Sequence, residues 1–332
     1  MLRCDEEEAI PVPEGSIKPG VVRVSAGARL HLGFLDLGGD LGRRFGSLGL
    51  AIDGFETEIV MRRASHFAVQ GGEPARVESL LRRLAETHRL DGAVAVEVVS
   101  AIPTHAGLGS GTQLALALSL AFRRLHGLPE DAQADAAALT RGARSGVGLA
   151  LFRHGGFMLD AGRGPATVLP PIVSHLPFPS DWRVVLLIDE ALEGAHGETE
   201  RAAFAALPPF PAAADVCHHV LMQVLPGVAE TDFPAFGAGI SAIQRRLGDH
   251  FAPAQGGGRF TSARVGEVAA TLERAGALGV GQSSWGPTGF VFAPDPDAAA
   301  SWAARAREAA RGKVHVRICA ARAGGARCDS LS

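Results

Sequence analysis

The sequence contains no tyrosine among its 332 residues, which excludes any chemistry that depends on a phenolic side chain of the protein. Cysteine is also scarce, since there are only four, and no two of them have the CxxC spacing of a zinc site or a redox pair. Their positions do not suggest a disulfide framework. We therefore expect a protein of a reducing, cytoplasmic compartment.

An excess of one charge is missing as well, because 32 lysines and arginines stand against 35 acidic residues. Proteins that bind nucleic acid through their overall field carry a clear positive surplus, so no nucleic-acid partner is expected. No apolar run approaches the ~20 residues that cross a bilayer. The N-terminal segment is acidic where a signal peptide is basic and apolar. We expect a soluble protein with no membrane partner.

Length and apolar content are sufficient for about two domains. Strand-like and helix-like segments mix without strict β-α-β alternation, which favours an α+β fold over a doubly wound parallel sheet. Four prolines within 170–181 predict a domain boundary. The predicted division is a flexible tail at 1–19, a first domain at 20–175 and a second domain at 180–325.

Hydrophobic periodicity and turn residues locate the elements. Strands are predicted at 21–37 with a bend at Gly27, and at 50–63, 94–102, 182–190 and 313–321. A glycine-rich loop and a strand are predicted within 279–294, and a strand hairpin around 155–156. Helices are predicted at 75–90, 112–126, 131–143, 199–206, 212–224, 233–249, 262–276 and 297–311.

The stretch IPTHAGLGSGTQLALAL has the composition of a phosphate cradle. Gly107, Gly109 and Gly111 allow a tight turn that aims several backbone N–H groups at one point. The following helix favours an anion at its N-terminus, and Ser110 and Thr112 add hydroxyl donors. A Walker A loop would require a lysine, and a dinucleotide fingerprint would require glycine in place of Thr112.

The segment PTHAGLGSGT resembles the phosphate loop of the GHMP superfamily, which includes galactokinase, homoserine kinase and mevalonate kinase. The segments ARLHLGFLD and GQSSWGPTGFVF resemble that family's first strand and its late glycine-rich loop. The resemblance implies a two-domain GHMP-kinase-like fold, with a ribosomal S5 domain 2-like N-terminal half and a ferredoxin-like C-terminal half. It also implies that phosphate or pyrophosphate is bound by Gly107, Leu108, Gly109, Ser110, Gly111, Thr112, Ser145 and Gly146.

Two departures from that family, at positions 148 and 111, bear on the chemistry. GHMP kinases typically carry P-S-G-x-D, in which the aspartate acts on the acceptor hydroxyl, and this chain has Arg144-Ser-Gly-Val-Gly148 in that frame. Glycine has no side chain and cannot act as a base at position 148. Gly111 likewise replaces a serine that often contacts the metal. Both positions weaken the interpretation as a kinase.

With these two departures, the chain resembles one branch of the superfamily, the β-ribofuranosylaminobenzene 5′-phosphate synthases. The segments that carry this resemblance are ARLHLGFLDLGGDLGRRFGSLGLAID, HAGLGSGTQLALAL, RGARSGVG and GQSSWGPTGF. That resemblance implies a transferase that joins phosphoribosyl pyrophosphate to 4-aminobenzoate, or to 4-hydroxybenzoate, and releases CO2 and pyrophosphate in tetrahydromethanopterin biosynthesis. It further implies Mg²⁺, no organic cofactor, and a homodimer. The nucleophile would be a ring carbon, so no hydroxyl would need to be deprotonated by an aspartate.

Candidate catalytic residues follow from the same motifs. Arg29 and His31 alternate on one strand and share a face, where Arg29 would pair with phosphate or carboxylate. Asp36 would contact ribose hydroxyls or the metal, and Arg144 would bind an anion. The alternatives are a solvated strand face and an exposed arginine at a helix end.

The late loop supplies candidate substrate-binding residues, with Trp285 either stacking on the aromatic acceptor or packing the loop onto the core. Candidate metal ligands are Asp36, Asp189 and Glu198, although Asp189 also reads as the end of a strand. The substrate-binding candidates are Gln282, Ser283, Ser284, Trp285 and Thr288. Two other functions stay open: a GHMP small-molecule kinase with a relocated base, and a non-catalytic phosphate-binding protein.

Overall fold

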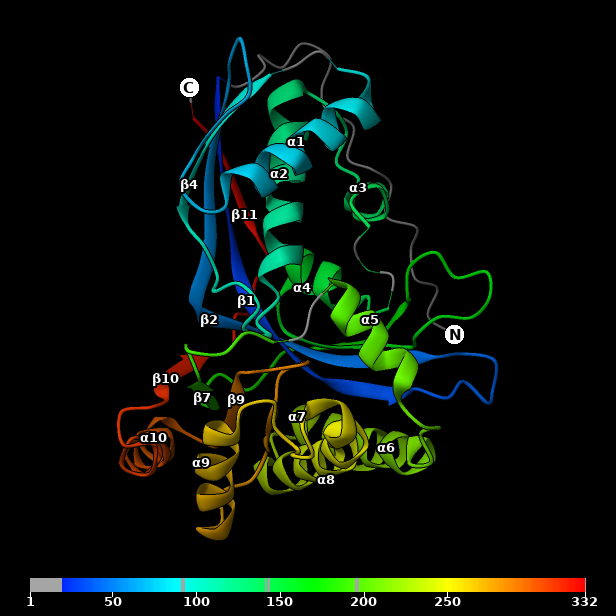
Figure 1. The fold of residues 1–332 in the computed structure, drawn as a ribbon, viewed down its shortest axis with the longest axis vertical. Coiled ribbons are helices and arrows are strands. Elements are labelled where there is room, and N and C mark those ends of the chain that lie inside the picture. The colour runs from blue at the N-terminus through cyan, green and yellow to red at the C-terminus, as the bar shows by residue number, and fades with distance from the viewer. Residues whose placement is uncertain (1–19, 91–92, 141, 143, 195–196, 332) are drawn as a thin grey trace.

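The computed structural model describes residues 20–90, 93–140, 142, 144–194 and 197–331 (Figure 1). The tail predicted at 1–19 lies outside the described residues. Figure 1 shows a sheet packed against helices in one half of the molecule, and a second sheet with its own helices below it.

The first sheet is built on a long antiparallel ribbon of β1 (Val21–Asp36) and β2 (Phe45–Arg63). Its strand order is β11-β1-β2-β4-β3, and β5 pairs with both the first half of β2 and β6. The predicted bend at Gly27 is a register shift in the ribbon, between Gly27 and Ala28. The other strands are β3 (Ala68–Gln70), β4 (Val94–Ser100), β5 (Phe157–Asp160), β6 (Ile172–Leu176) and β11 (Arg327–Leu331).

The second sheet has the order β10-β7-β9-β8, and all its neighbours are antiparallel. Numbered along the chain, this is the 4-1-3-2 arrangement of a ferredoxin-like fold, as predicted for the C-terminal half. Its strands are β7 (Arg183–Ile188), β8 (Val280–Gln282), β9 (Gly289–Ala293) and β10 (His315–Ala320).

Helices cover the sheets and supply most of the remaining core. In the first half they are α1 (Pro74–His88), α2 (Ser110–His126), α3 (Ala132–Ala138) and α4 (Val147–His154). They continue with α5 (Gly197–Ala206), α6 (Ala213–His219), α7 (Leu225–Ala229), α8 (Phe233–Phe251), α9 (Ala263–Arg274) and α10 (Pro296–Ala310). A π-helical turn η1 (Val220–Val224) joins α6 to α7, and a 3-10 turn η2 (Ala252–Gln255) follows α8. None of the helices in the described ranges is both long and apolar enough to cross a bilayer.

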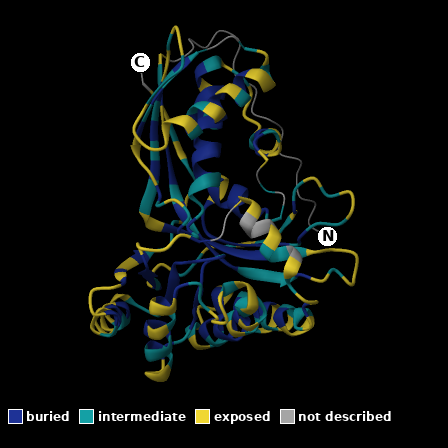
Figure 2. Ribbon diagram, in the orientation of Figure 1, coloured by how far each residue is buried: buried dark blue, intermediate teal, exposed yellow. Residues whose placement is uncertain are grey.

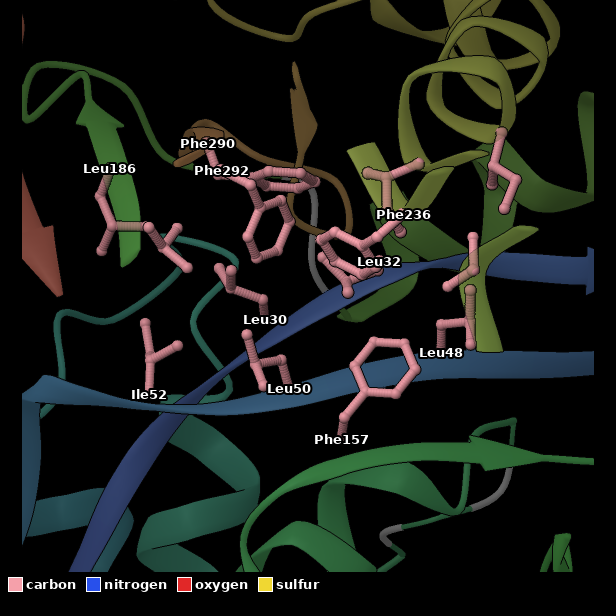
Figure 3. Close-up of a cluster of buried hydrophobic side chains, with 14 of the residues drawn as sticks. Leu30, Leu32, Leu48, Leu50, Ile52, Phe157, Leu186, Phe236, Phe290 and Phe292 are labelled. Carbon is pink, nitrogen blue, oxygen red and sulfur yellow. The ribbon is translucent and has the colours of Figure 1, made fainter. Parts of the chain in front are cut away.

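The two sheets share a hydrophobic core. Leu30 and Leu50 of the β1–β2 ribbon and Phe157 of β5 belong to the same buried cluster as Phe236 of α8 and Phe292 of β9 (Figure 3). All five side chains are fully buried. Burial of such large apolar side chains stabilises by about 1.5–3 kcal/mol each, so the cluster couples the two halves where the motifs of the sequence converge. Figure 2 shows the same buried zone between the two layers.

One local prediction is wrong. The hairpin predicted around Gly155 and Gly156 is a corner between α4 and β5, in which both glycines have positive φ angles of 68° and 76°. The short apolar run of α4 cannot be distinguished from a strand by periodicity alone. The proline-rich segment at 170–181, where a domain boundary is predicted, contains β6, which pairs with β5.

The C-terminal end of the chain returns to the first sheet. β11 pairs with β1 from Val21 to Ser25, although its short polar sequence did not predict a strand. The division at 20–175 and 180–325 remains a prediction, and β11 adds residues beyond 325 to the sheet of the first half.

Candidate active site

The phosphate loop leads directly into α2. Gly107 and Gly109 have φ angles of +78° and +84°, which glycine adopts without the strain of a Cβ atom. α2 begins at Ser110, two residues earlier than predicted, so Gly111 and Thr112 belong to its first turn. That turn contains no acidic residue, and the N-cap is Gly109, which has no side chain. The N-terminal dipole of a 17-residue helix is therefore not neutralised by a local carboxylate.

The late loop is bound directly to this phosphate loop and to β1. Ser283 Oγ donates to the carbonyl of Gly107 at 2.8 Å, and it accepts from the backbone N–H of His31 at 3.0 Å. The N–H of Ser284 donates to the carbonyl of His31 at 3.1 Å. Three segments, predicted separately as parts of one site, are thus in contact.

Arg29 lies along the phosphate loop. Its backbone N–H donates to the carbonyl of Leu108 at 3.1 Å, and its Nη1 donates to the carbonyl of Gly107 at 2.9 Å. A Cβ atom at Gly109 would lie 2.9 Å from the Arg29 Cγ atom. The absence of a side chain at Gly109 lets the guanidinium group approach the loop.

Gly148, at the position of the kinase base, faces the same helix terminus. A Cβ atom there would lie 3.4 Å from Thr112 Cγ2, which is ordinary van der Waals contact. The amide of Gln113 donates to the Gly148 carbonyl at 3.2 Å, and Gln113 is buried rather than on an outer face. Gly148 therefore lies beside the first turn of α2 and offers no side chain there.

Asp160 organises the neighbouring N-terminus of α4, and sequence reasoning missed it. Its Oδ2 accepts from Ser47 Oγ at 2.6 Å and from the N–H of Gly146 at 2.9 Å, and its Oδ1 accepts from the N–H of Gly162 at 2.8 Å. Burial raises the pKa of this carboxyl, and the hydrogen bonds oppose that rise. The signal in the sequence was an acid at the end of the apolar strand FMLD.

Asp160 also changes how the predicted phosphate ligands of this segment are placed. Ser145 Oγ lies 2.7 Å from Ser47 Oγ and 3.4 Å from Asp160 Oδ2. The Gly146 N–H is already donated to Asp160. The structure thus brings Ser145 and Gly146 next to the site but engages them within the protein, whereas the first turn of α2 lacks such a carboxylate.

His31 occupies the centre of the site. Its side chain is buried, and neither ring nitrogen has a hydrogen-bond partner among the described residues. Burial, and then the charges of Arg29 and Arg144, lower the pKa of His31 to about 3. The imidazole is therefore neutral at physiological pH, with one donor and one acceptor nitrogen.

One aromatic side chain contacts that imidazole, and a further aromatic cluster lies around Trp285. The ring centroids of His31 and Phe34 are 4.5 Å apart. Phe204 of α5 lies edge-on to Trp285 at 5.1 Å, and Phe251 of α8 lies 4.8 Å from Trp285. The guanidinium of Arg144 stacks over Phe204 at 4.7 Å. Sequence reasoning missed the three phenylalanines, because they come from β1, α5 and α8 and meet only on folding.

A cavity opens between this cluster and the C-terminal half of α8. Trp285 is buried and lines it, which places this residue against both the core and the site. The lining residues include His31, Phe34, Phe251, Gln255, Ser284 and Trp285.

Two other predicted substrate ligands are directed into the protein. The Gln282 amide accepts from the N–H of Thr261 at 2.7 Å and donates to Gln255 at 2.7 Å and to the Ser284 carbonyl at 3.3 Å. Thr288 is completely buried, and its hydroxyl has no partner among the described residues. Gln282 therefore has its polar atoms engaged in holding the late loop against η2.

The predicted metal ligands do not form a cluster. Asp36 accepts from the N–H groups of Gly38 and Gly39 and so caps a turn. Asp189 is buried and accepts from Ser262 Oγ at 2.7 Å, and Glu198 is exposed on α5. No group of three or more His, Cys, Asp or Glu side chains in the described ranges is arranged to hold a metal ion. The described residues therefore do not fit a metal ion held by protein ligands alone.

Comparison with protein families identifies the class. The family model for the GHMP kinases N-terminal domain matches residues 75–156, and the model for the GHMP kinases C-terminal domain matches residues 224–312. The first match contains the phosphate loop and Gly148, and the second contains the late loop. The chain therefore belongs to the GHMP kinase superfamily and is an enzyme of that superfamily.

Curated relatives narrow the class further. The chain is 35% identical to a β-ribofuranosylphenol 5′-phosphate synthase from Archaeoglobus fulgidus, over 82% of this chain and 88% of that protein. It is 29% identical to the synthase of the same name from Methanothermobacter thermautotrophicus, over 80% of this chain and 86% of that protein. The resemblance to this branch, stated from the motifs, is confirmed.

Solved structures confirm the fold. A homoserine kinase from Cytophaga hutchinsonii superposes with a TM-score of 0.67 at 19% identity, covering 95% of this chain and 99% of that one. A mevalonate diphosphate decarboxylase from Enterococcus faecalis superposes with a TM-score of 0.66 at 18% identity, covering 94% and 99%. At these identities the comparison establishes the shared α+β architecture.

Proposed function

We propose that this enzyme transfers a phosphoribosyl group from phosphoribosyl pyrophosphate to a ring carbon of a para-substituted benzoate, with release of CO2 and pyrophosphate. The sequence predicted 4-aminobenzoate as acceptor with 4-hydroxybenzoate as the alternative. The name of the curated relatives specifies a phenol product, so both acceptors belong in the test. Mg²⁺, a homodimer, a cytoplasmic setting and a role in tetrahydromethanopterin biosynthesis remain predictions that accompany this proposal.

The observation that carries the proposal is the empty base position beside an intact phosphate cradle. Gly148 offers no group that could deprotonate an acceptor hydroxyl next to Thr112. Carbon–carbon bond formation with loss of CO2 needs no base at that position, because the electron pair of the breaking C–C bond returns to the ring. What the reaction requires is stabilisation of the leaving pyrophosphate and alignment of the two substrates.

Each part of the site supports one of these requirements. The first turn of α2 would bind the departing pyrophosphate through its N–H groups and its dipole. Arg29 and Arg144 supply positive charge near His31. The aromatic cluster around Trp285 would hold the flat acceptor and exclude water from the carboxylate that is lost.

A single assay tests the proposal. The full chain is incubated with phosphoribosyl pyrophosphate, Mg²⁺ and carboxyl-labelled 4-hydroxybenzoate or 4-aminobenzoate, and labelled CO2 is measured. We expect CO2 in equal amount to pyrophosphate. ADP formation from ATP with a sugar or mevalonate-type acceptor, and no CO2, would instead support the kinase. Binding of the donor without turnover would support a phosphate-binding protein.

Gly148→Asp restores the residue of the kinase motif and is expected to fold, because its Cβ meets only ordinary contacts. The new carboxylate would lie beside Thr112 at the α2 N-terminus and repel the pyrophosphate. We expect at least a tenfold loss of kcat/KM for CO2 release, and a thermal melt measures the cost of a carboxylate at this buried position. Gly148→Asn is the neutral control of equal size and should lose less. A Gly148→Asp variant with higher synthase activity would contradict our account of the missing base.

A further inference from the structure

We propose that the cavity lined by His31, Phe34, Phe251 and Trp285 binds the aromatic ring of the acceptor, and that His31 pairs with the para hydroxyl or amino group and carries its proton through the reaction. This inference rests on the proposed function for its substrate class. It assigns an orientation to the acceptor ring. It also assigns a role to His31, whose unpaired ring nitrogens are not explained by packing alone.

The first support is the unsatisfied imidazole. Both ring nitrogens of His31 are buried without a hydrogen-bond partner in the part of the chain that the structure describes. A buried polar atom left unpaired costs about 1–3 kcal/mol, so this arrangement is expected where a ligand completes the bonding. His31 is one of the residues that line the cavity.

The second support is the shape and composition of the walls. Phe34 lies against the imidazole, and Trp285 and Phe251 form a neighbouring aromatic pair. Aromatic rings pack on one another in tilted and edge-to-face arrangements at these distances. The charged residue of the wall, Arg259, is already paired with Asp249 at 2.5 Å. The cavity encloses about 30 Å³ in this structure, so its aromatic walls must move apart to admit a flat ring.

Charge decides which end of the acceptor meets His31. The cations near this histidine are Arg29 and Arg144, and Arg29 lies along the phosphate loop. The carboxylate that becomes CO2 belongs on that side, where the donor's anomeric carbon must also lie. The opposite, uncharged end of the ring then reaches the neutral imidazole, which accepts a hydrogen bond from a hydroxyl or amino group.

The proton balance of the reaction gives His31 a chemical role. As the ring carbon that bears the carboxylate bonds to the anomeric carbon, pyrophosphate leaves with the C–O electron pair, and the para group becomes strongly acidic. His31 takes its proton and leaves a neutral dienone or imine. CO2 then departs, its C–C electron pair restores the aromatic ring, and the para group recovers the proton. For the hydroxyl acceptor a weak base suffices, because the protonated dienone is a far stronger acid than imidazolium.

Calorimetric titration of the full chain with benzoate, 4-hydroxybenzoate and 4-aminobenzoate tests the orientation. We expect the two para-substituted acids to bind at least tenfold tighter than benzoate. His31→Leu should reduce that ratio to about one, whereas His66→Leu, at an exposed histidine remote in sequence, should preserve it. Because the pKa of His31 is about 3, the ratio should stay constant between pH 5 and pH 8. A ratio unchanged in His31→Leu would overturn the assignment.

His31→Gln separates binding from proton transfer. Glutamine keeps a hydrogen-bond acceptor but cannot take up a proton, so the affinity ratio should survive in part while kcat for CO2 release falls at least tenfold. Equal kcat in His31→Gln and the wild type would remove the proton-carrying role. If the wild type releases no CO2 but the ratio still depends on His31, the ring site stands and the proposed reaction fails. If CO2 is released but the affinity ratio is the same in His31→Leu and the wild type, the proposed reaction stands and this inference fails.

Discussion

Gly107→Ala is expected to lower the activity at least a hundredfold and to destabilise the fold. A Cβ atom at this position would lie 2.4 Å from the carbonyl oxygen of Ser283 and 3.0 Å from that of Gly286. Backbone atoms cannot rotate out of the way as a side chain can, so the phosphate loop and the late loop would separate. The bonds from Ser283 to Gly107 and to β1 would be lost with them. Turnover and a thermal melt measure the two effects.

Gly312→Ala is the matched control. Gly312 has a φ of +76°, close to the +78° of Gly107, but an added Cβ there would meet nothing within 4 Å. It should show only the cost of a left-handed alanine, about 1 kcal/mol, with full activity. If Gly107→Ala were as active as Gly312→Ala, the contact between the two loops would not matter for the reaction.

Asp160→Ala is expected to reduce the free energy of unfolding by about 4 kcal/mol, because two buried N–H donors, of Gly146 and Gly162, would lose their acceptor at about 1–3 kcal/mol each. The N-terminus of α4 would also lose its carboxylate. Since α4 carries Gly148 against Thr112, activity should fall as well. Urea unfolding monitored by circular dichroism gives the energy.

Asp181→Ala, at an exposed aspartate, provides the comparison and should change stability by less than ~0.5 kcal/mol. Asp160→Asn should fall between the two, since its amide retains one acceptor oxygen. An Asp160→Ala variant as stable as Asp181→Ala would mean that Asp160 does not hold α4 in place.

The extent to which sequence predicted this structure differs between segments. The α2 helix and its glycine loop were located to within two residues, because their signal is local: glycines, hydroxyl residues and a long apolar run. The ferredoxin-like half was predicted through motif resemblance rather than periodicity, and the strand order confirms it. β11 was missed, because a short polar strand is specified by its partner β1 and not by its own residues.

The candidate site shows the same contrast. Sequence motifs identified Arg29, His31 and Trp285, but they could not show that both nitrogens of His31 are buried without partners. Burial depends on every element packed around the side chain, and here those elements come from three distant parts of the chain. Phe204 and Phe251 lie outside every recognised motif, so the sequence did not predict that they belong to the site.

The sequence by itself determined the family, the position of the phosphate cradle and the loss of the kinase base, since each is a matter of which residue stands in a recognisable frame. Only the tertiary structure decided that Asp160 accepts a hydrogen bond from Gly146 and that Phe251 packs against Trp285. These facts are distances between residues far apart in the chain. Such distances are set by how the two sheets share one core, which no local pattern encodes.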